Sequence, residues 1–289
     1  MTALPAVLQV QDLGDGHYAA PHPENDPEQR GVVFSGQILA QMIMVSDLAV
    51  EHAKEAKSIH TIFARAGTYS AGPLDYVRDP MHSGRAWGSD TITVTQGDRL
   101  LSRGLVLMNT VEPDLMRHAP AIPDVPGPDG FDPAPFSMFD TVESRAVVGF
   151  DATDAGGTPT DYTWIRSSES YDSVAANQAV VAWMQPGTII GLAMRPHTEI
   201  DIRQAHREIS TGVISHTCHF HEHFDVGDWL LLAQHATYAG RGRVYGVGEV
   251  FTRDGALVAS FAQDSMARRN WRARGAISGQ QGWNETATG

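Results

Sequence analysis

One apolar segment near the N-terminus begins with polar residues that a helix core does not need. From residue 37 to residue 50, hydrophobic side chains surround the helix axis almost completely, a pattern typical of a helix enclosed by protein. It predicts a buried helix over residues 35 to 53. The start of this segment, SGQILAQ, includes Ser35, Gly36, Gln37 and Gln41. Buried polar groups need hydrogen-bond partners, so these residues belong either to structural contacts or to a functional site.

The two halves of the chain repeat each other. GRAWG at 84 to 88 returns as GRVYG at 242 to 246, an offset of 158 residues (242 − 84). The same offset aligns three further identical pairs, which are Gly97 with Gly255, Ser102 with Ser260, and Met108 with Met266. The intervening segments alternate between apolar and polar residues like strands, and a helical pattern precedes each copy, at 35 to 53 and at about 172 to 185. The chain is therefore interpreted as a duplication of one unit.

Each unit combines one buried helix with antiparallel strands joined by tight glycine turns, so a sheet must cover the helix. This predicts an α+β fold, a double hotdog, with two antiparallel sheets that each wrap one central helix and join edge to edge. The expected parts are an N-terminal unit (1–112), a proline-rich linker (113–135), a C-terminal unit (136–270) and a polar tail (271–289). The linker holds seven of the 16 prolines, which exclude a helix or central strand. The acidic stretch at 151 to 161 is expected to form a hairpin loop.

Composition narrows the class of function. The net charge of −13 argues against a nucleic-acid partner, because no basic stripe can displace counterions from phosphates. A single cysteine, Cys218, excludes an internal disulfide. No apolar run approaches the ~20 residues of a membrane span, and the N-terminus lacks a targeting pattern, so a cytoplasmic location is expected.

Four stretches form motifs: FSGQILAQ at 34 to 41, SIHTIFARAG at 58 to 67, HTCHFHEHFDVGDWLLL at 216 to 232, and FTRDGALVASFAQDSMAR at 251 to 268. Together they resemble the two-hotdog acyl-CoA thioesterases of the bacterial thioesterase II type, which are related to the peroxisomal acyl-CoA thioesterases. The resemblance covers most of residues 30 to 270. It implies hydrolysis of acyl-CoA thioesters to a free acid and CoA.

The resemblance also implies which residues hold the attacking water. The family uses an Asp at the end of the second helix, a Thr or Ser on a later strand and a Gln on the last strand. Gln263 matches the glutamine, whereas Gln185 or Pro186 stands at the Asp position and Val213 at the Thr position. Gln263 and Gln185 are expected to position water, but an amide cannot deprotonate it. At the offset of 158 residues the counterpart of Gln263 is Leu105, so the polar group belongs to one half only.

The start of the first helix is the expected place for the thioester carbonyl. Its first N–H groups lack intrahelical partners, and the Gly36 N–H could stabilise the oxyanion that forms when water attacks. Ser35, Gln37 and His216 are expected to contact substrate. In the structural alternative, Ser35 is an ordinary N-cap, and Gln37 satisfies buried strand carbonyls.

The general base is left open. Asp264, His216 and His221 lie near the matched positions, but Asp264 follows Gln263 on a strand and should face the opposite side. The run HTCHFHEHF places His219, His221 and His223 on one strand face, which raises the possibility of a metal site. Since the thioesterase resemblance already accounts for His221, no metal and no cofactor are predicted.

Three functions were weighed. Acyl-CoA hydrolysis comes first, a non-hydrolytic acyl-thioester-binding protein second, and a hotdog hydratase third, because FSGQ offers neither the His nor the acidic residue that a hydratase would need. Self-association is expected, because hotdog sheets leave edge strands and a convex face that need protection. The sequence does not choose the acyl chain length or branching, or the size of the oligomer.

Overall fold

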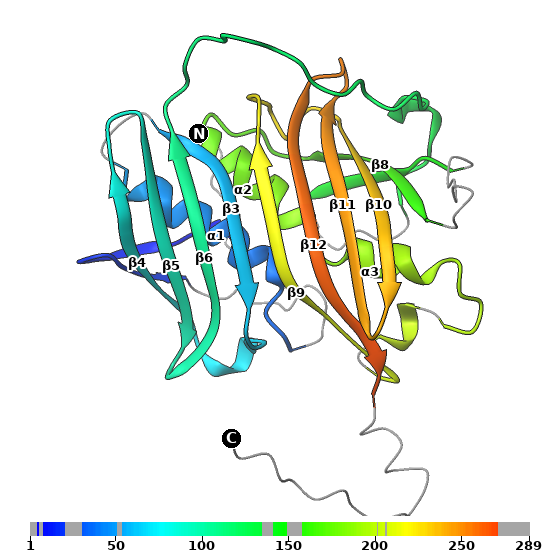
Figure 1. Cartoon of the computed structure of the whole chain (residues 1–289), viewed down its shortest axis with the longest axis horizontal. Helices are drawn as coiled ribbons and strands as arrows, with labels where there is room; N and C mark the ends of the chain where they lie inside the picture. The colour runs from blue at the N-terminus through cyan, green and yellow to red at the C-terminus, as the bar shows by residue number, and fades with distance from the viewer. Residues whose placement is uncertain are drawn as a thin grey trace, which may run out of the picture.

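The computed structural model describes residues 5, 8–20, 31–50, 54–134, 141–148, 158–200, 202–205 and 207–270. Its strands form one sheet in the order β1-β2-β4-β5-β6-β3-β9-β12-β11-β10-β8-β7 (Figure 1). The strands of the first half are β1 (Gln11–Gly14), β2 (His17–Ala20), β3 (Glu55–Phe63), β4 (Leu74–Ser83), β5 (Trp87–Gln96) and β6 (Arg99–Asn109). Those of the second half are β7 (Val142–Ala146), β8 (Thr160–Ser167), β9 (Ile209–Phe220), β10 (Leu230–Gly240), β11 (Arg243–Thr252) and β12 (Leu257–Arg269). The helices are α1 (Ser35–Leu48), α2 (Val174–Met184) and α3 (Thr188–Met194).

The strand order confirms the double hotdog. The series β2-β4-β5-β6-β3 in one half is mirrored by β9-β12-β11-β10-β8 in the other. The halves join where β3 pairs antiparallel with β9, from Ser58 opposite His219 to Ile62 opposite Ser215. The boundaries of the two units stay a prediction.

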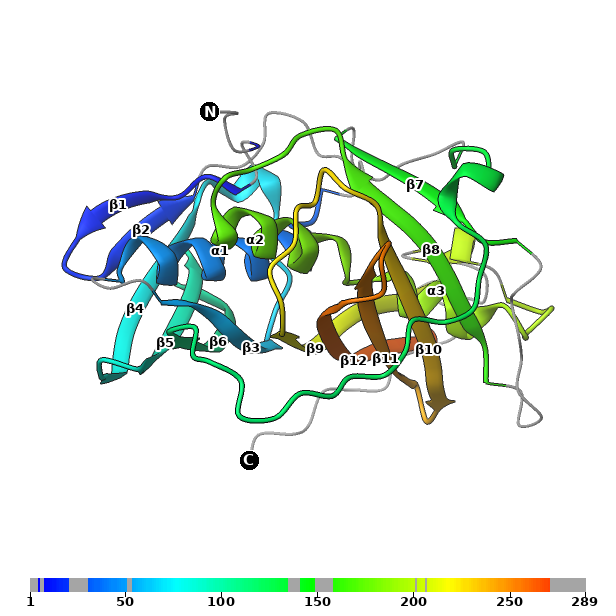
Figure 2. The ribbon, with the colours of Figure 1, turned by 90° about the horizontal axis from the view of Figure 1, so that it is seen from above.

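The two main helices lie side by side on the inner face of the curved sheet (Figure 2). Eleven residues of α1, from Gly36 to Ser46, are buried, as the apolar pattern predicts. The predicted end at residue 53 is wrong, because α1 stops at Leu48; residues 51 to 53 lie outside the described part. Helix α2 is capped by Ser173, whose Oγ accepts a hydrogen bond from the Ala176 N–H at 3.3 Å.

The repeat register at the last strand of each half differs from the sequence offset. Gln263 is 1% exposed and points inward, whereas Leu105 is 44% exposed and points outward. Gly88 pairs with Met108, whereas its repeat counterpart Gly246 pairs with Gln263, so the last strands are out of step by three residues. Because strand side chains alternate, an odd mismatch places a side chain on the opposite face. The β5–β6 turn spans two residues, between the paired Gln96 and Arg99, whereas the β11–β12 connection is longer. Leu105 is therefore not the structural counterpart of Gln263, and the prediction that paired them is wrong.

The connections follow the proline and glycine pattern. Within the described residues, the stretch after β6 contains no helix or strand except a 3-10 turn at Pro128–Gly130, and it crosses one end of the sheet toward β7 (Figure 1). Strands β7 and β8 pair antiparallel, as the predicted hairpin requires, although residues 151 to 157 of its loop lie outside the description. The predicted tail at 271 to 289 also lies outside it. None of the described helices is long and apolar enough to cross a membrane.

Candidate active site

The start of α1 is built by packing rather than by a polar cap. The N-cap residue is Phe34, without a side-chain cap, so the alternative that made Ser35 an N-cap is wrong. A Cβ on Gly36 would lie 2.2 Å from the carbonyl oxygen of Trp183. Glycine is therefore required here because α1 and α2 touch, a reason other than the close approach of substrate that the sequence suggested.

The two buried glutamines of α1 accept hydrogen bonds from tyrosines. The Tyr69 hydroxyl donates to Gln37 Oε1 at 3.3 Å, and the Tyr76 hydroxyl donates to Gln41 Oε1 at 2.5 Å. Burial raises the pKa of Tyr76 well above its ordinary value, so this phenol keeps its proton and remains a donor. Gln41 therefore has a structural partner in Tyr76, and the Oε1 of Gln37 accepts the Tyr69 hydroxyl; a contact between Gln37 and substrate stays a prediction.

A buried polar network joins the end of α2 to β9 and β12. Gln185 Oε1 lies 2.9 Å from His216 Nε2, and Gln185 Nε2 donates to Cys218 Sγ at 3.5 Å. Gln263 Oε1 lies 3.4 Å from His216 Nδ1, and Gln263 Nε2 donates to Ser265 Oγ at 2.9 Å. The structure thus brings together three predicted site residues, Gln185, His216 and Gln263.

Burial controls the protonation of this network. Desolvation lowers the pKa of His216 to about 4, against a weaker opposing hydrogen bond with Gln263. The imidazole is therefore neutral near pH 7, and the 2.9 Å contact is best satisfied by a proton on Nε2 that is donated to Gln185 Oε1. Burial also raises the pKa of the Cys218 thiol to about 12, so it is not a nucleophile at neutral pH.

The start of α3 connects the network to a cavity. The Gly187 N–H donates to Gln263 Oε1 at 3.3 Å. The Thr188 hydroxyl lies 2.5 Å from Gln234 Oε1 and 3.0 Å from the carbonyl oxygen of Gln185. Gly187 and Thr188 both line the cavity, so they are the surface of the network that a ligand would meet.

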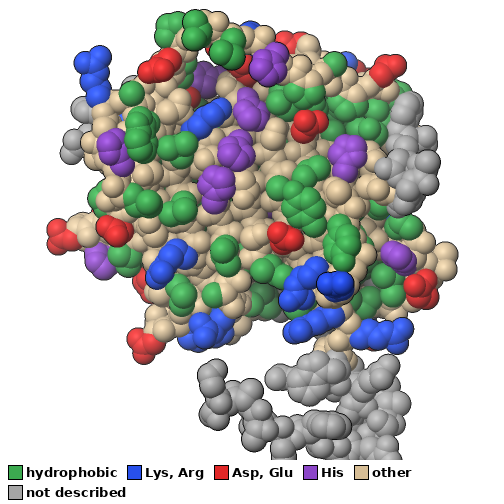
Figure 3. All heavy atoms as spheres, viewed as in Figure 1, with side chains coloured by type: hydrophobic (Ala, Val, Ile, Leu, Met, Phe, Trp, Pro, Cys, Tyr) green, Lys and Arg blue, Asp and Glu red, His purple; other side chains and the backbone are tan. Residues whose placement is uncertain are grey.

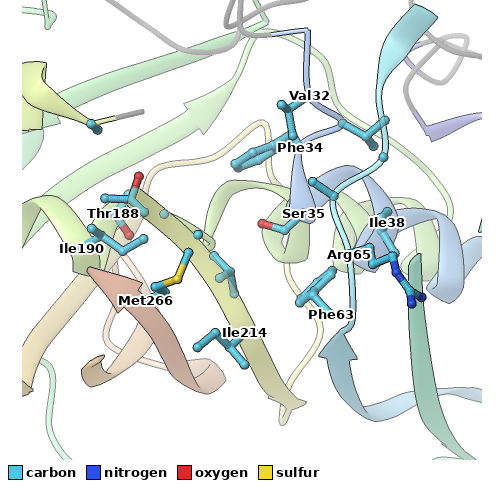
Figure 4. A pocket seen from close by; sticks show the side chains of 18 of the residues that line it. Val32, Phe34, Ser35, Ile38, Phe63, Arg65, Thr188, Ile190, Ile214 and Met266 are labelled. Carbon is cyan, nitrogen blue, oxygen red and sulfur yellow. The ribbon is translucent and has the colours of Figure 1, made fainter. Parts of the chain in front are cut away.

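The cavity has a volume of about 600 Å³ and lies between the start of α1 and the end of β3 on one side, and α3 and β12 on the other (Figure 4). Most of its walls are apolar, including Phe34, Phe63, Ile190, Ile214 and Met266. Among the described residues that line it, the polar side chains are Ser35, Arg65, Thr188 and Thr211, and none is acidic. This shape suits an apolar chain whose polar end meets Thr188.

The predicted site residues lie at different depths from this cavity. Ser35 lines it, and so does Val213, at the position where the family has Thr. Gly36 and Gln37 lie behind Ser35 in α1, whereas Gln185, His216 and Gln263 form the layer behind Gly187 and Thr188. The sequence analysis missed Gly187, Thr188 and Gln234. A glycine followed by threonine after the α2 pattern indicates the start of a new helix. The contact of Thr188 with Gln234 on β10, however, is a tertiary contact that no local pattern predicts.

The histidines of the β9 region are placed separately. Asp264 is exposed and bonds Ser215 Oγ at 3.4 Å, which confirms that it faces away from Gln263. His221 Nε2 lies 3.0 Å from Ser260 Oγ, and His223 Nε2 lies 2.7 Å from Glu55 Oε2. Among the described residues, no group of three or more His, Cys, Asp or Glu could hold a metal ion.

Comparison with known proteins identifies the family. The model of the acyl-CoA thioesterase C-terminal domain matches residues 116–267, which is more than half of the 289 residues. The chain belongs to the acyl-CoA thioesterase II family. Mouse (Mus musculus) acyl-coenzyme A thioesterase 8 is 20% identical over 91% of this chain and 88% of its own length. Acyl-CoA thioesterase 2 of Haemophilus influenzae is 24% identical over 82% of this chain and 87% of its own.

Several solved structures share the fold. The acyl-CoA thioesterase II TesB2 of Mycobacterium marinum superposes with a TM-score of 0.77 at 21% identity, covering 92% of this chain and 98% of that chain. A hot dog fold protein of unknown function from Alicyclobacillus acidocaldarius gives a TM-score of 0.73 at 18% identity, over 91% of this chain and 97% of that chain. At this identity the likeness concerns the fold, and the chemistry must be argued from the residues present.

Proposed function

We propose that this protein hydrolyses acyl-CoA thioesters to a free acid and CoA. The observation that supports this most is the apolar cavity that ends at Thr188 and Gly187, in a chain of the acyl-CoA thioesterase II family. Gly187 is held by the Gln263 side chain and Thr188 by the Gln185 main-chain carbonyl. The acyl chain would occupy the apolar walls, and the CoA arm would leave through the mouth. A cavity of about 600 Å³ lies within the usual range of ligand sites.

In this proposal the water molecule is held beside Thr188. The Thr188 hydroxyl has one proton to share between Gln234 and the Gln185 carbonyl, so its oxygen can accept a hydrogen bond from water. Gln263 fixes the loop through the Gly187 N–H. Hydroxide formed from this water adds to the thioester carbonyl carbon and gives a tetrahedral oxyanion. The oxyanion collapses as the carbon–sulfur bond breaks, and the CoA thiolate leaves and takes up the proton of the new carboxylic acid.

The oxyanion that forms during attack would be stabilised at the start of α1. Ser35 lines the cavity there, and the peptide dipoles of the 14-residue helix make this end partly positive. The N–H groups of Ser35 and Gly36 are the proposed donors. His216 holds the Gln185 amide in place rather than contacting substrate, which revises the role expected for it.

No carboxylate or imidazole lines the cavity in the described part of the chain, and this decides how the water loses its proton. Amides and a threonine hydroxyl can orient water but cannot deprotonate it near pH 7. The reaction in this proposal therefore depends on hydroxide concentration. The same observation supports the second candidate, a protein that binds acyl thioesters without hydrolysing them.

Release of free CoA separates these two functions. Wild-type protein is incubated with straight-chain acyl-CoAs of increasing length, and the thiol is measured with a chromogenic disulfide. Hydrolysis predicts thiol release that is proportional to enzyme and saturates with substrate. If calorimetry shows binding of the same acyl-CoAs but no thiol is released above the uncatalysed rate, the result would refute hydrolysis and support the non-hydrolytic binding function.

We also propose that the protein self-associates through the outer face of the sheet. Ile62 is 65% exposed on β3, and Leu105 and Tyr238 are exposed on β6 and β10. Apolar side chains are scattered over this face among polar ones (Figure 3). Sedimentation at micromolar concentration should show a dimer or larger assembly, and a monomer alone would contradict the proposal.

A further inference from the structure

Arginine side chains gather at the end of the sheet where the cavity opens. Figure 3 shows Lys and Arg side chains grouped at this end, over the start of β6 and the end of β12. We call four of them the arginine rim, defined as Arg65, Arg99, Arg268 and Arg269. Arg65 is the one charged residue among those that line the described cavity.

Backbone contacts hold two of these side chains near the mouth. Arg65 Nη1 donates to the carbonyl oxygen of Leu100 at 3.3 Å, and Arg99 Nη2 donates to the carbonyl oxygen of Ala66 at 3.4 Å. Ala66 itself lines the cavity. Each guanidinium has five donor hydrogens, so most of them remain for another acceptor.

The other two arginines of the rim come shortly after a cavity-lining residue in the sequence. Arg268 and Arg269 end β12, two and three residues after the cavity-lining Met266, and both are exposed. Arg268 is paired in register with Ser210, next to Thr211 of the cavity wall. Arg268 and Arg269 thus lie at the end of β12 beside the cavity wall, with side chains that leave opposite faces of the strand. The rim combines residues from both halves of the chain.

The rim lacks the carboxylate partners that neutralise arginines elsewhere. Within the described residues, salt bridges with Asp or Glu are formed by Arg78, Arg117, Arg145, Arg166, Arg195 and Arg253, and none by a rim arginine. The chain as a whole has a net charge of −13, so its overall field repels an anion. Four guanidinium groups without a carboxylate partner among the described residues are a local exception to this field.

We propose that the arginine rim binds the phosphate groups of CoA while the acyl chain occupies the cavity. This inference rests on the proposed function. CoA carries a diphosphate and a 3′-phosphate, joined to the thioester by the uncharged pantetheine arm. Guanidinium groups bind phosphate oxygens through paired hydrogen bonds, which a lysine cannot reproduce. The rim thus favours phosphorylated thiol carriers over small thioesters.

The test compares two thioesters of the same acyl chain, an acyl-CoA and an acyl-N-acetylcysteamine, which has no phosphate. The variants are Arg65→Ala, Arg99→Ala and the double variant; the control is Arg253→Ala, at the opposite end of β11 and β12. Each rim substitution should raise KM for acyl-CoA about 3- to 10-fold, as expected for an exposed charge-assisted contact. KM for the cysteamine thioester and kcat for both should stay unchanged. The control should change neither KM.

Salt provides a second readout. Raising ionic strength from about 0.05 to 0.3 M should raise KM for acyl-CoA in the wild type, but much less in the double variant. An equal KM increase for both thioesters, or no increase for either, would overturn the rim proposal while leaving the hydrolase intact.

A binding measurement tests the arginine rim independently of hydrolysis. Calorimetry with CoA, dephospho-CoA and pantetheine should give affinities that fall in that order for wild type and differ less in the double variant, which keeps only Arg268 and Arg269 of the rim. Failure of the wild type to hydrolyse either thioester would refute the proposed function. The affinity order for the three thiols would still decide the rim, and equal wild-type affinities would refute it.

Discussion

Gln263→Ala removes the side chain that fixes the wall of the cavity. The Gln263 amide contacts the Gly187 N–H at 3.3 Å, Ser265 Oγ at 2.9 Å and His216 Nδ1 at 3.4 Å. Alanine leaves the Gly187 N–H and the Ser265 hydroxyl without this partner in a site that is almost fully buried. The loop that carries the neighbouring Thr188 then loses its anchor.

Two magnitudes follow from these contacts. Two hydrogen bonds at about 1 kcal/mol each, with the cost of the space left behind, predict a loss of about 2–3 kcal/mol in the free energy of unfolding. Displacement of Thr188, which positions the water, predicts a fall in kcat of about 10²-fold, with KM changed much less. The catalytic effect therefore exceeds what partial unfolding would cause.

The assay pairs CoA release with chemical denaturation, and Gln178→Ala is the matched control. Gln178 is also buried, and its Nε2 donates to the carbonyl oxygen of Ala56 at 2.9 Å, away from the residues that line the cavity. The control should lose stability but keep kcat within about twofold of wild type. A Gln263→Ala protein with wild-type kcat, or a control that loses as much, would refute this role of Gln263.

Two further predictions concern folding. Burial lowers the pKa of His216 to about 4, below its ordinary 6.5, so the contribution of the neutral imidazole to stability is complete above pH 6.5 and is lost as the pH falls toward 4. Between pH 7 and 4, the free energy of unfolding measured in urea should fall about 3 kcal/mol more in wild type than in His216→Gln. Parallel pH curves for the two proteins would contradict this prediction. Gly36→Ala should lower the free energy of unfolding by about 1–3 kcal/mol, because the added Cβ would collide with the Trp183 carbonyl. A thermal melt equal to that of wild type would show that α1 and α2 can separate without cost.

The sequence predicted the fold because its signals were local and repeated. Gly97 and Gly255 both adopt positive φ at the matched turns, and the buried pattern of α1 begins where FSGQ predicts. The sheet face on which Gln263 lies relative to Leu105 could not be predicted, because it depends on turns of different length. These turns shift the pairing of the last strand by three residues, an odd number that reverses the face. A repeat in sequence therefore established the architecture but not which side chains share a face.

The candidate site was predicted only in part for a similar reason. Gln185, Gln263 and His216 were found through motifs, but their mutual contacts join residues far apart in the chain. Thr188 and its neighbour Gln234 belong to no motif, and only the packing of α3 on β10 brings them together. Residues that act by tertiary contact leave no pattern in a single sequence.

The most direct test of the account is the dependence of kcat/KM on pH for acyl-CoA hydrolysis by the wild type. The central claim is that the Thr188 hydroxyl, held in place by its hydrogen bonds with Gln185 and Gln234, positions water in a cavity that no described carboxylate or imidazole lines. It predicts that kcat/KM rises about tenfold per pH unit between pH 6 and 8, following hydroxide. A flat profile above about pH 5, the mark of an ionised carboxylate acting as the base, would contradict the claim.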